Sequence, residues 1–203
     1  MHKYEFKEKY MNISLKSSGP VSTEFSRRGI VTFGQACECV KNLPYKRNQD
    51  KSDIFCVFRD GGGTCSTKHA LLKILAEENH LKNVKLMLGI FKMNAQNTPK
   101  IATVLQKYHL KEMPEAHNYL QIDKKILDCT RRHSSPEDFV NELVEEIEIE
   151  PDQLIDFKIK YHKNFLQKYL QENNRFPSQS QSSGRSAKNA SPLYSDKKPI
   201  KIN

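Results

Sequence analysis

The order of hydrophobic and polar residues along the chain predicts helices both before and after a group of strands. In five stretches, apolar side chains recur every three or four positions, a spacing typical of helices with one buried face. The predicted helices span residues 33–43, 65–78, 97–108, 135–149 and 151–172. Pro44 ends the first helix, while Thr64 and Ser135 are residue types that cap a helix start.

Branched and aromatic residues predict strands over residues 84–93, 116–122 and 125–130. Only Asp123 and Lys124 separate the last two, so we expect a hairpin with a two-residue turn. Residues 54–58 are apolar but too few to distinguish a strand from a buried turn of helix. The elements come in runs of one kind rather than in strict alternation, which favours an α+β fold with an antiparallel sheet.

Three regions follow from this pattern. Residues 1–25 are polar and weakly patterned, and we expect them to form an extended N-terminal arm. Residues 26–173 are enough for one domain, which includes the C-terminal helices. Residues 174–203 form a basic tail in which a serine-rich stretch, 178–192, is predicted to be disordered because it is low in hydrophobic residues.

The net charge of +9 is uneven along the chain. The tail from Asn174 has six basic residues and one acid, a net charge of +5, which leaves +4 for the rest. That remainder does not argue for a nucleic-acid groove, so we expect no specific nucleic-acid partner. Weak binding of an anionic partner through the tail remains an alternative, and it would depend steeply on salt.

Five cysteines without regular spacing argue against a disulfide framework and favour reduced thiols. The N-terminus is charged and has no apolar segment of the kind found in secretory signals. No run of 18 apolar residues is present, so we expect no membrane partner and a cytoplasmic protein.

The segment GGGTCSTKHALL, residues 61–72, places Cys65 where a glycine-rich loop becomes a helix. The N-terminus of a helix carries partial positive charge and unpaired N–H groups, and both favour a thiolate over a thiol. The same N–H groups can stabilise the oxygen anion of a tetrahedral intermediate. The alternative is that Cys65 only fills space. A residue that could act as its base is needed to decide between a reactive thiol and a packing residue.

Two histidines are candidates for that base. His69 follows Cys65 by one helical turn, away from the open helix end, and no second Cys/His pair with metal-ligand spacing follows. We therefore expect no metal and no cofactor. His117 is the better candidate, because the two-residue turn would place Asp128 on the same sheet face, diagonal to His117 and within side-chain reach.

Cysteine, histidine and aspartate in this arrangement form the nucleophile, base and orienting group of cysteine acyl transfer. The segments Gly63-Thr64-Cys65, Ala116-His117 and Leu127-Asp128-Cys129-Thr130 resemble the transglutaminase-like superfamily of papain-like cysteine acyl enzymes. GTCSTKHALL and LPYKRN are similar to a bacterial-type subgroup with no assigned substrate. The resemblance implies a papain/transglutaminase-like core, with the cysteine helix packed on an antiparallel sheet, and the catalytic residues Cys65, His117 and Asp128.

We expect Gly63, Thr64, Tyr45 and Asn48 to line the substrate site or to stabilise an oxyanion, although a solvated loop is the alternative for the last two. The expected function is hydrolysis, deamidation or acyl transfer on a peptide, protein or small amide substrate. The chain has no tryptophan and no calcium-binding loop spacing, so protein cross-linking is the less favoured reaction. A non-catalytic binding module on the same fold is the alternative.

Overall fold

Residues 10–172 of the 203-residue chain are described in a computed structural model. They form an α+β fold with one antiparallel sheet of four strands in the order β3-β2-β1-β4. The strands are β1 (Val84–Asn94), β2 (Glu112–Ile122), β3 (Lys125–Leu127) and β4 (Leu143–Ile149). The antiparallel α+β prediction is therefore confirmed.

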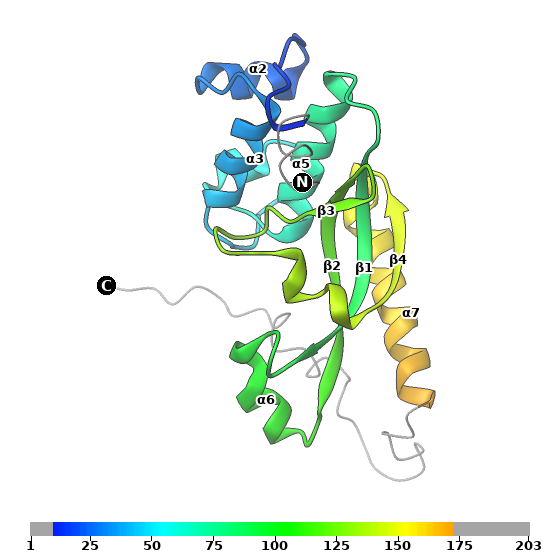
Figure 1. The fold of residues 1–203 in the computed structure, drawn as a ribbon. Helices are drawn as coiled ribbons and strands as arrows, with labels where there is room; N and C mark the ends of the chain where they lie inside the picture. Colours follow the sequence, from blue (N-terminus) through cyan, green and yellow to red (C-terminus); the bar gives the residue numbers. More distant parts are fainter. Residues whose placement is uncertain (1–9, 173–203) are drawn as a thin grey trace, which may run out of the picture.

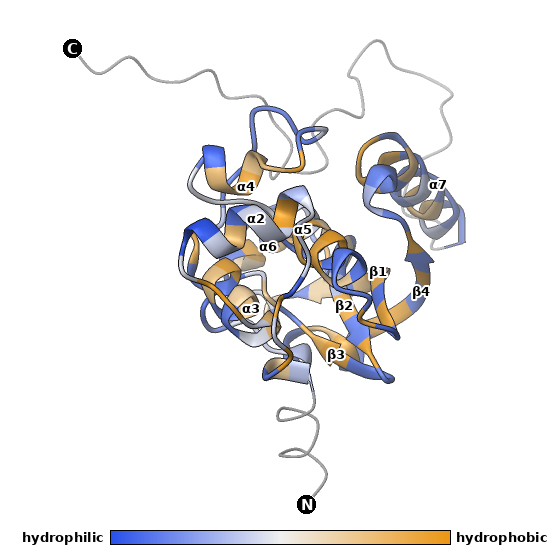
Figure 2. Cartoon of the chain, turned by 90° about the horizontal axis from the view of Figure 1, so that it is seen from above, coloured by the Kyte–Doolittle hydropathy of each residue, from blue (hydrophilic) through white to orange (hydrophobic). Residues whose placement is uncertain are grey.

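The helices of the first half gather at one end of the sheet, as Figure 1 shows. They are α2 (Pro20–Arg27), α3 (Phe33–Asn42), the short α4 (Cys56–Arg59) and α5 (Cys65–Glu78). At the other end, the β1–β2 hairpin extends beyond the other strands and carries η1 (Pro99–Ile101) and α6 (Ala102–Lys107) at its tip. The helix α7 (Asp156–Glu172) follows β4 and lies well apart from α3 in the view from above (Figure 2).

Alternating residues of β1 and β2 divide the core into two clusters on opposite faces of the sheet. Leu86, Leu88 and Leu120 belong to the larger cluster, which also contains the buried side chains of α2, α3 and α5. Met87 and Tyr119 belong to the smaller cluster, which also contains buried residues of the segment 91–105 and Phe139. The catalytic candidates lie where these two clusters meet at the edge of β2.

Two predicted segments differ in the structure. The expected helix over residues 135–149 is instead two short 3₁₀ turns, η2 (Pro136–Asp138) and η3 (Val140–Glu142), followed by β4. The cap residue Ser135 starts only the first turn. The branched residues of LVEEIEI suit a strand, and pairing with β1 satisfies their backbone groups, which overrides the helix-start signal.

The arm expected over residues 1–25 is also not extended throughout, because α2 begins at Pro20. Its Val21 and Phe25 are completely buried in the larger cluster, so the expected boundary at residue 26 falls inside a core helix. The ambiguous segment 54–58 contains the helix α4. Residues 1–9 and the tail predicted over residues 174–203 lie outside the described residues.

The predicted C-terminal helix begins as the 3₁₀ turn η4 (Pro151–Leu154) and continues as α7. Within residues 10–172, no helix is both long and apolar enough to cross a membrane.

Candidate active site

Cys65 is the first residue of α5, as the sequence predicts. Thr64 caps the helix: its side chain accepts from the Thr67 amide, and the Thr67 hydroxyl accepts from the Thr64 amide at 3.0 Å. Gly63 has no room for a side chain, since a Cβ there would lie 2.7 Å from Thr67 Oγ1. Gly63 and Thr64 therefore shape the turn that presents the thiol at the helix N-terminus.

The hairpin of β2 and β3 has the predicted register, with Ile122 opposite Lys125 and Leu120 opposite Leu127. Asp123 and Lys124 have φ angles of 46° and 67°, which is the left-handed conformation of a type I′ turn. β3 ends at Leu127, before it would reach the position opposite His117. The edge of β2 is consequently open at His117, and other side chains can reach the imidazole there.

Asp128 occupies this opening. Its Oδ2 lies 3.1 Å from His117 Nε2, and its Oδ1 accepts from the Thr130 amide at 2.8 Å. The His117 imidazole lies close enough to the Cys65 thiol for each group to shift the pKa of the other. Because Asp128 contacts Nε2, the other ring nitrogen, Nδ1, is left to face the thiol. The structure thus brings together the three residues that the sequence analysis selected.

The charges of these three groups reinforce one another. Burial raises the pKa of the Cys65 thiol, but the Lys158 ammonium, the His117 imidazole and the backbone N–H of Asn118 together hold it well below its usual value. Burial lowers the pKa of His117, yet the Cys65 thiolate and the Asp128 carboxylate raise it to about 10. Burial also raises the pKa of Asp128, whereas its hydrogen bond to His117 keeps it well below its ordinary range. The favoured state is therefore a thiolate–imidazolium pair beside an ionised aspartate.

Aromatic rings enclose the imidazole. The ring centroid of Phe139 lies 4.8 Å from that of His117 in an edge-on arrangement, and those of Phe91 and Tyr119 lie 6.1 Å away. The His117 side chain is only 14% exposed. The rings limit the access of water to the ion pair, which strengthens the electrostatic interactions within it.

Lys158 is a site residue that the sequence analysis missed. It lies on α7, and its ammonium donates to Asn118 Oδ1 at 2.6 Å and to Ser66 Oγ at 2.9 Å, and lies 3.9 Å from Cys65 Sγ. Only 7% of the residue is exposed. A sequence signal existed, because Lys158 is one helical turn after the buried Leu154, on the stripe that should be apolar.

Asn118 links the two helices to the sheet. Its Oδ1 accepts from Ser66 and Lys158, and its Nδ2 donates to the Met87 carbonyl at 2.9 Å. Asn118 directly follows His117 on β2. In the structure it is completely buried and fixes the ammonium of Lys158 beside the thiol.

His69 is not a base for Cys65. Its ring is completely buried, with Nδ1 2.7 Å from the Cys65 carbonyl and Nε2 2.7 Å from the Cys129 amide. An amide can only donate, so Nε2 accepts and the proton resides on Nδ1. The 3.6 Å approach of Nε2 to Asp128 is therefore not an ion pair. His69 instead ties the first turn of α5 to the chain that follows Asp128.

Lys68, the residue before His69 on α5, also ties this helix to neighbouring parts of the chain. Its buried ammonium donates to the Leu43 carbonyl at 2.6 Å and to the Thr130 carbonyl at 2.9 Å. Burial lowers the pKa of Lys68 to about 8, partly offset by Cys129 and Asp128. The two loops that flank the catalytic helix are thereby held at fixed positions.

The expected roles of Asn48 and Tyr45 need correction. The Asn48 amide donates to the carbonyls of Cys56 and Gly62 and to Asp60 Oδ2, and its oxygen accepts from Thr67 at 2.7 Å. Asn48 therefore anchors the loop and is not an oxyanion donor. Tyr45 pairs with Gly63 through the backbone, while its ring is 45% exposed.

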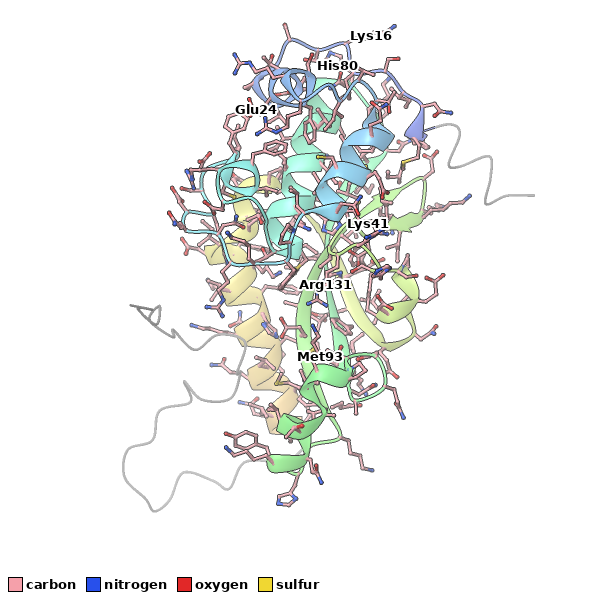
Figure 3. All side chains as sticks on the ribbon, turned by 90° about the vertical axis from the view of Figure 1, so that its left-hand side faces the viewer. Lys16, Glu24, Lys41, His80, Met93 and Arg131 are labelled. Atoms are coloured by element: carbon pink, nitrogen blue, oxygen red, sulfur yellow. The ribbon has the colours of Figure 1, made fainter. Side chains whose placement is uncertain are left out.

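The Tyr45 ring is covered by Arg131, whose guanidinium carbon lies 4.5 Å from the ring centroid. Figure 3 shows Arg131 in the middle of the molecule, between Lys41 and Met93. Tyr45 and Arg131 thus join the loop before Cys65 to the loop after Asp128 at the surface.

Glu115 is partly buried on β2, two residues before His117. Burial raises the pKa of Glu115, whereas Lys158 and His117 lower it and the Cys65 thiolate raises it, which together give a pKa of about 7. Among residues 10–172, no hydrogen bond or ion pair holds its carboxylate. Glu115 therefore changes charge near neutral pH beside the catalytic candidates.

The remaining cysteines are free in the structure. Cys37 and Cys129 are both buried in the larger core cluster. Across residues 10–172, no three His, Cys, Asp or Glu side chains are placed to hold a metal ion.

Comparisons with protein-family models, with curated proteins and with solved structures return no match for this chain.

Proposed function

We propose that this protein carries out cysteine-dependent acyl chemistry on a peptide or amide bond, with the fold organisation of the papain and transglutaminase-like enzymes. Cys65 is the nucleophile, His117 the acid and base, and Asp128 the group that orients the imidazole. The observation that supports the proposal best is that His117 Nε2 lies 3.1 Å from Asp128 Oδ2 while the imidazole lowers the pKa of the Cys65 thiol.

In the first half of the reaction, the thiolate attacks the substrate carbonyl carbon and a tetrahedral intermediate forms. Its oxygen anion is stabilised by the N–H groups at the start of α5 and by the nearby Lys158 ammonium. The carbon–nitrogen bond then breaks, and the leaving amine takes the proton from His117. The products are a free amine, a thioester on Cys65 and a neutral imidazole.

In the second half, water attacks the thioester and transfers a proton to His117. The carboxylic acid is released, and the thiolate–imidazolium pair is restored. When the leaving group is the ammonia of a carboxamide, the same steps amount to deamidation. When an amine replaces water, they amount to acyl transfer.

Alkylation with iodoacetamide, read by mass spectrometry, tests this proposal. We expect Cys65 to be modified faster at pH 6–7 than any other cysteine, and the preference to fall in a His117→Ala variant. Cys39 is the matched control, because it is more exposed than Cys65 but burial raises its pKa. Labelling of Cys65 no faster than that of Cys39 would contradict the proposal and favour a non-catalytic binding module.

A further inference from the structure

An apolar cavity of about 330 Å³ lies beside the catalytic helix. Its apolar lining includes Leu71 and Ile74 of α5, Leu154 and Ile155 at the start of the C-terminal helix, and Ile54. Lys51, Ser52, Asp53 and Asp152 provide its polar groups. Concave apolar sites of this size with a few polar groups are typical of small-ligand sites.

Lys51 contributes a positive charge to this cavity, and no acidic side chain of the described residues forms an ion pair with it. It is partly buried, and no hydrogen bond or ion pair holds its ammonium within the described residues. Burial lowers the pKa of Lys51, and the positive charges of Lys158 and Arg47 lower it further. An anion bound here would relieve both the repulsion and the loss of solvation.

The two acids of the cavity do not supply that anion. Asp53 accepts from the Phe55 amide at 2.8 Å and is paired with the Arg59 guanidinium. Asp152 is exposed to water and makes no ion pair with Lys51 in the part of the chain that is described.

The cavity adjoins the catalytic residues in two ways. Lys51 interacts electrostatically with both Cys65 and Lys158. Leu154 lines the cavity, and Lys158, one turn further along, contacts Ser66 and Cys65. A carboxylate paired with Lys51 therefore lies within electrostatic range of Cys65.

We propose that this cavity binds the C-terminal residue of a peptide substrate, with a hydrophobic side chain among the isoleucines and leucines and the terminal carboxylate paired with Lys51. The peptide bond before the terminal residue lies one residue length, about 3.3–3.6 Å, from that carboxylate, and in this proposal it is the bond that Cys65 attacks. The inference rests on the proposed function and specifies its substrate class.

The reaction is then removal of a C-terminal hydrophobic residue. The thiolate forms a thioester with the penultimate carbonyl carbon, the carbon–nitrogen bond breaks, and the released amino acid takes its proton from His117. Water hydrolyses the thioester and returns a proton to His117, leaving a peptide shorter by one residue.

Two peptides that end in leucine, one with a free carboxylate and one with a terminal amide, test the role of Lys51. We expect the amide to lower kcat/KM about tenfold with the wild-type protein. The difference should disappear in a Lys51→Gln variant and return in Lys51→Arg. Lys46→Gln is the matched control, because Lys46 lies on the same loop but donates to the Asp60 carbonyl instead. An equal preference in wild type and Lys51→Gln would overturn the proposal.

A binding measurement separates this inference from the proposed chemistry. N-acetyl-L-leucine and its amide are titrated into a Cys65→Ser variant and followed by methyl NMR signals of Ile54, Leu71 and Ile74. Saturable shifts with the carboxylate and not with the amide support the cavity assignment even if no peptide is cleaved. A wild-type thiol that is selectively alkylated, together with no binding of N-acetyl-L-leucine, would refute the cavity assignment alone.

Discussion

At the scale of single residues, the reactivity of Cys65 depends on which charges surround it. A helix N-terminus alone lowers a thiol pKa modestly, whereas a full positive charge within 4 Å has a much larger effect where water is excluded. Here the Lys158 ammonium lies 3.9 Å from the sulfur, and the His117 imidazole also lowers the pKa of the thiol. His117 could be predicted from the hairpin pattern. Lys158 was not, because it follows Cys65 by 93 positions and only folding makes them neighbours.

Replacing Lys158 with methionine should raise the pKa of Cys65, since the ammonium that favours the thiolate is lost. We expect the midpoint of the pH dependence of iodoacetamide alkylation to move upward by about 1–3 pH units. Lys160→Met is the control, because Lys160 is exposed on the same helix. The same midpoint in Lys158→Met and in wild type would show that the ammonium does not stabilise the thiolate.

Glu115 should tune the approach of charged reagents to Cys65. Its carboxyl ionises near pH 7. As the pH rises from 6 to 8, the negatively charged iodoacetate should therefore alkylate Cys65 more slowly relative to neutral iodoacetamide. We expect the ratio of the two alkylation rates to fall by about fivefold, the effect of roughly 1 kcal/mol of repulsion. In Glu115→Gln the ratio should stay constant over this range. A wild-type ratio that does not change with pH would exclude a titrating carboxylate beside the thiol.

At the scale of elements, the β2–β3 hairpin determines which face Asp128 shares with His117. A slip of one residue would reverse the faces of β3 relative to β2. The turn residues Asp123 and Lys124 both have positive φ, which suits a type I′ turn and matches the twist of the strands. This register could be predicted from the two-residue spacing alone, since local turn geometry sets it.

Lys124→Gly should stabilise the protein, because glycine adopts a φ of 67° without the strain that a side chain brings. We expect the free energy of unfolding in urea to rise by about 1 kcal/mol, with no change in Cys65 alkylation. The paired control Lys125→Gly, one residue later in β3, should lower it by about 0.5–1 kcal/mol. A loss of stability in Lys124→Gly would contradict the turn assignment.

At the scale of the whole molecule, α5, the β2–β3 hairpin and α7 meet at one edge of the sheet, where Asn118 contacts residues of both helices. This arrangement buries several ionisable groups close together, which costs free energy of folding. The effects of these groups on stability have opposite signs and largely cancel. The raised pKa of His117 stabilises the fold less as the pH rises from 6.5 to about 10, whereas the lowered pKa of Cys65 stabilises it more as the pH approaches 9.

The effect of Glu115 on stability is not cancelled by a neighbouring group in this way. Its pKa rises from 4.5 in the unfolded chain to about 7 in the fold, so its contribution to stability is complete below pH 4.5 and is lost as the pH rises through 7. We expect the free energy of unfolding of wild type, relative to Glu115→Gln, to decrease by about 1–3 kcal/mol between pH 4.5 and 7 and to stay level above. Urea unfolding at five pH values measures this difference. A difference that is constant with pH would show that Glu115 has an ordinary pKa.

The sequence by itself determined the features that depend on local geometry: the helix start at Cys65 with its Thr64 cap, and the hairpin that puts Asp128 beside His117. The tertiary structure decided the rest. Residues 143–149 became a strand because the free edge of β1 offered backbone partners, although the preceding residues signalled a helix. Lys158, Glu115 and the cavity at Lys51 acquired their positions from long-range packing. Burial and neighbouring charges act through space, so spacing along the chain could not show which residues become neighbours; for Lys158 it showed only a charged residue on a helix stripe that should be apolar.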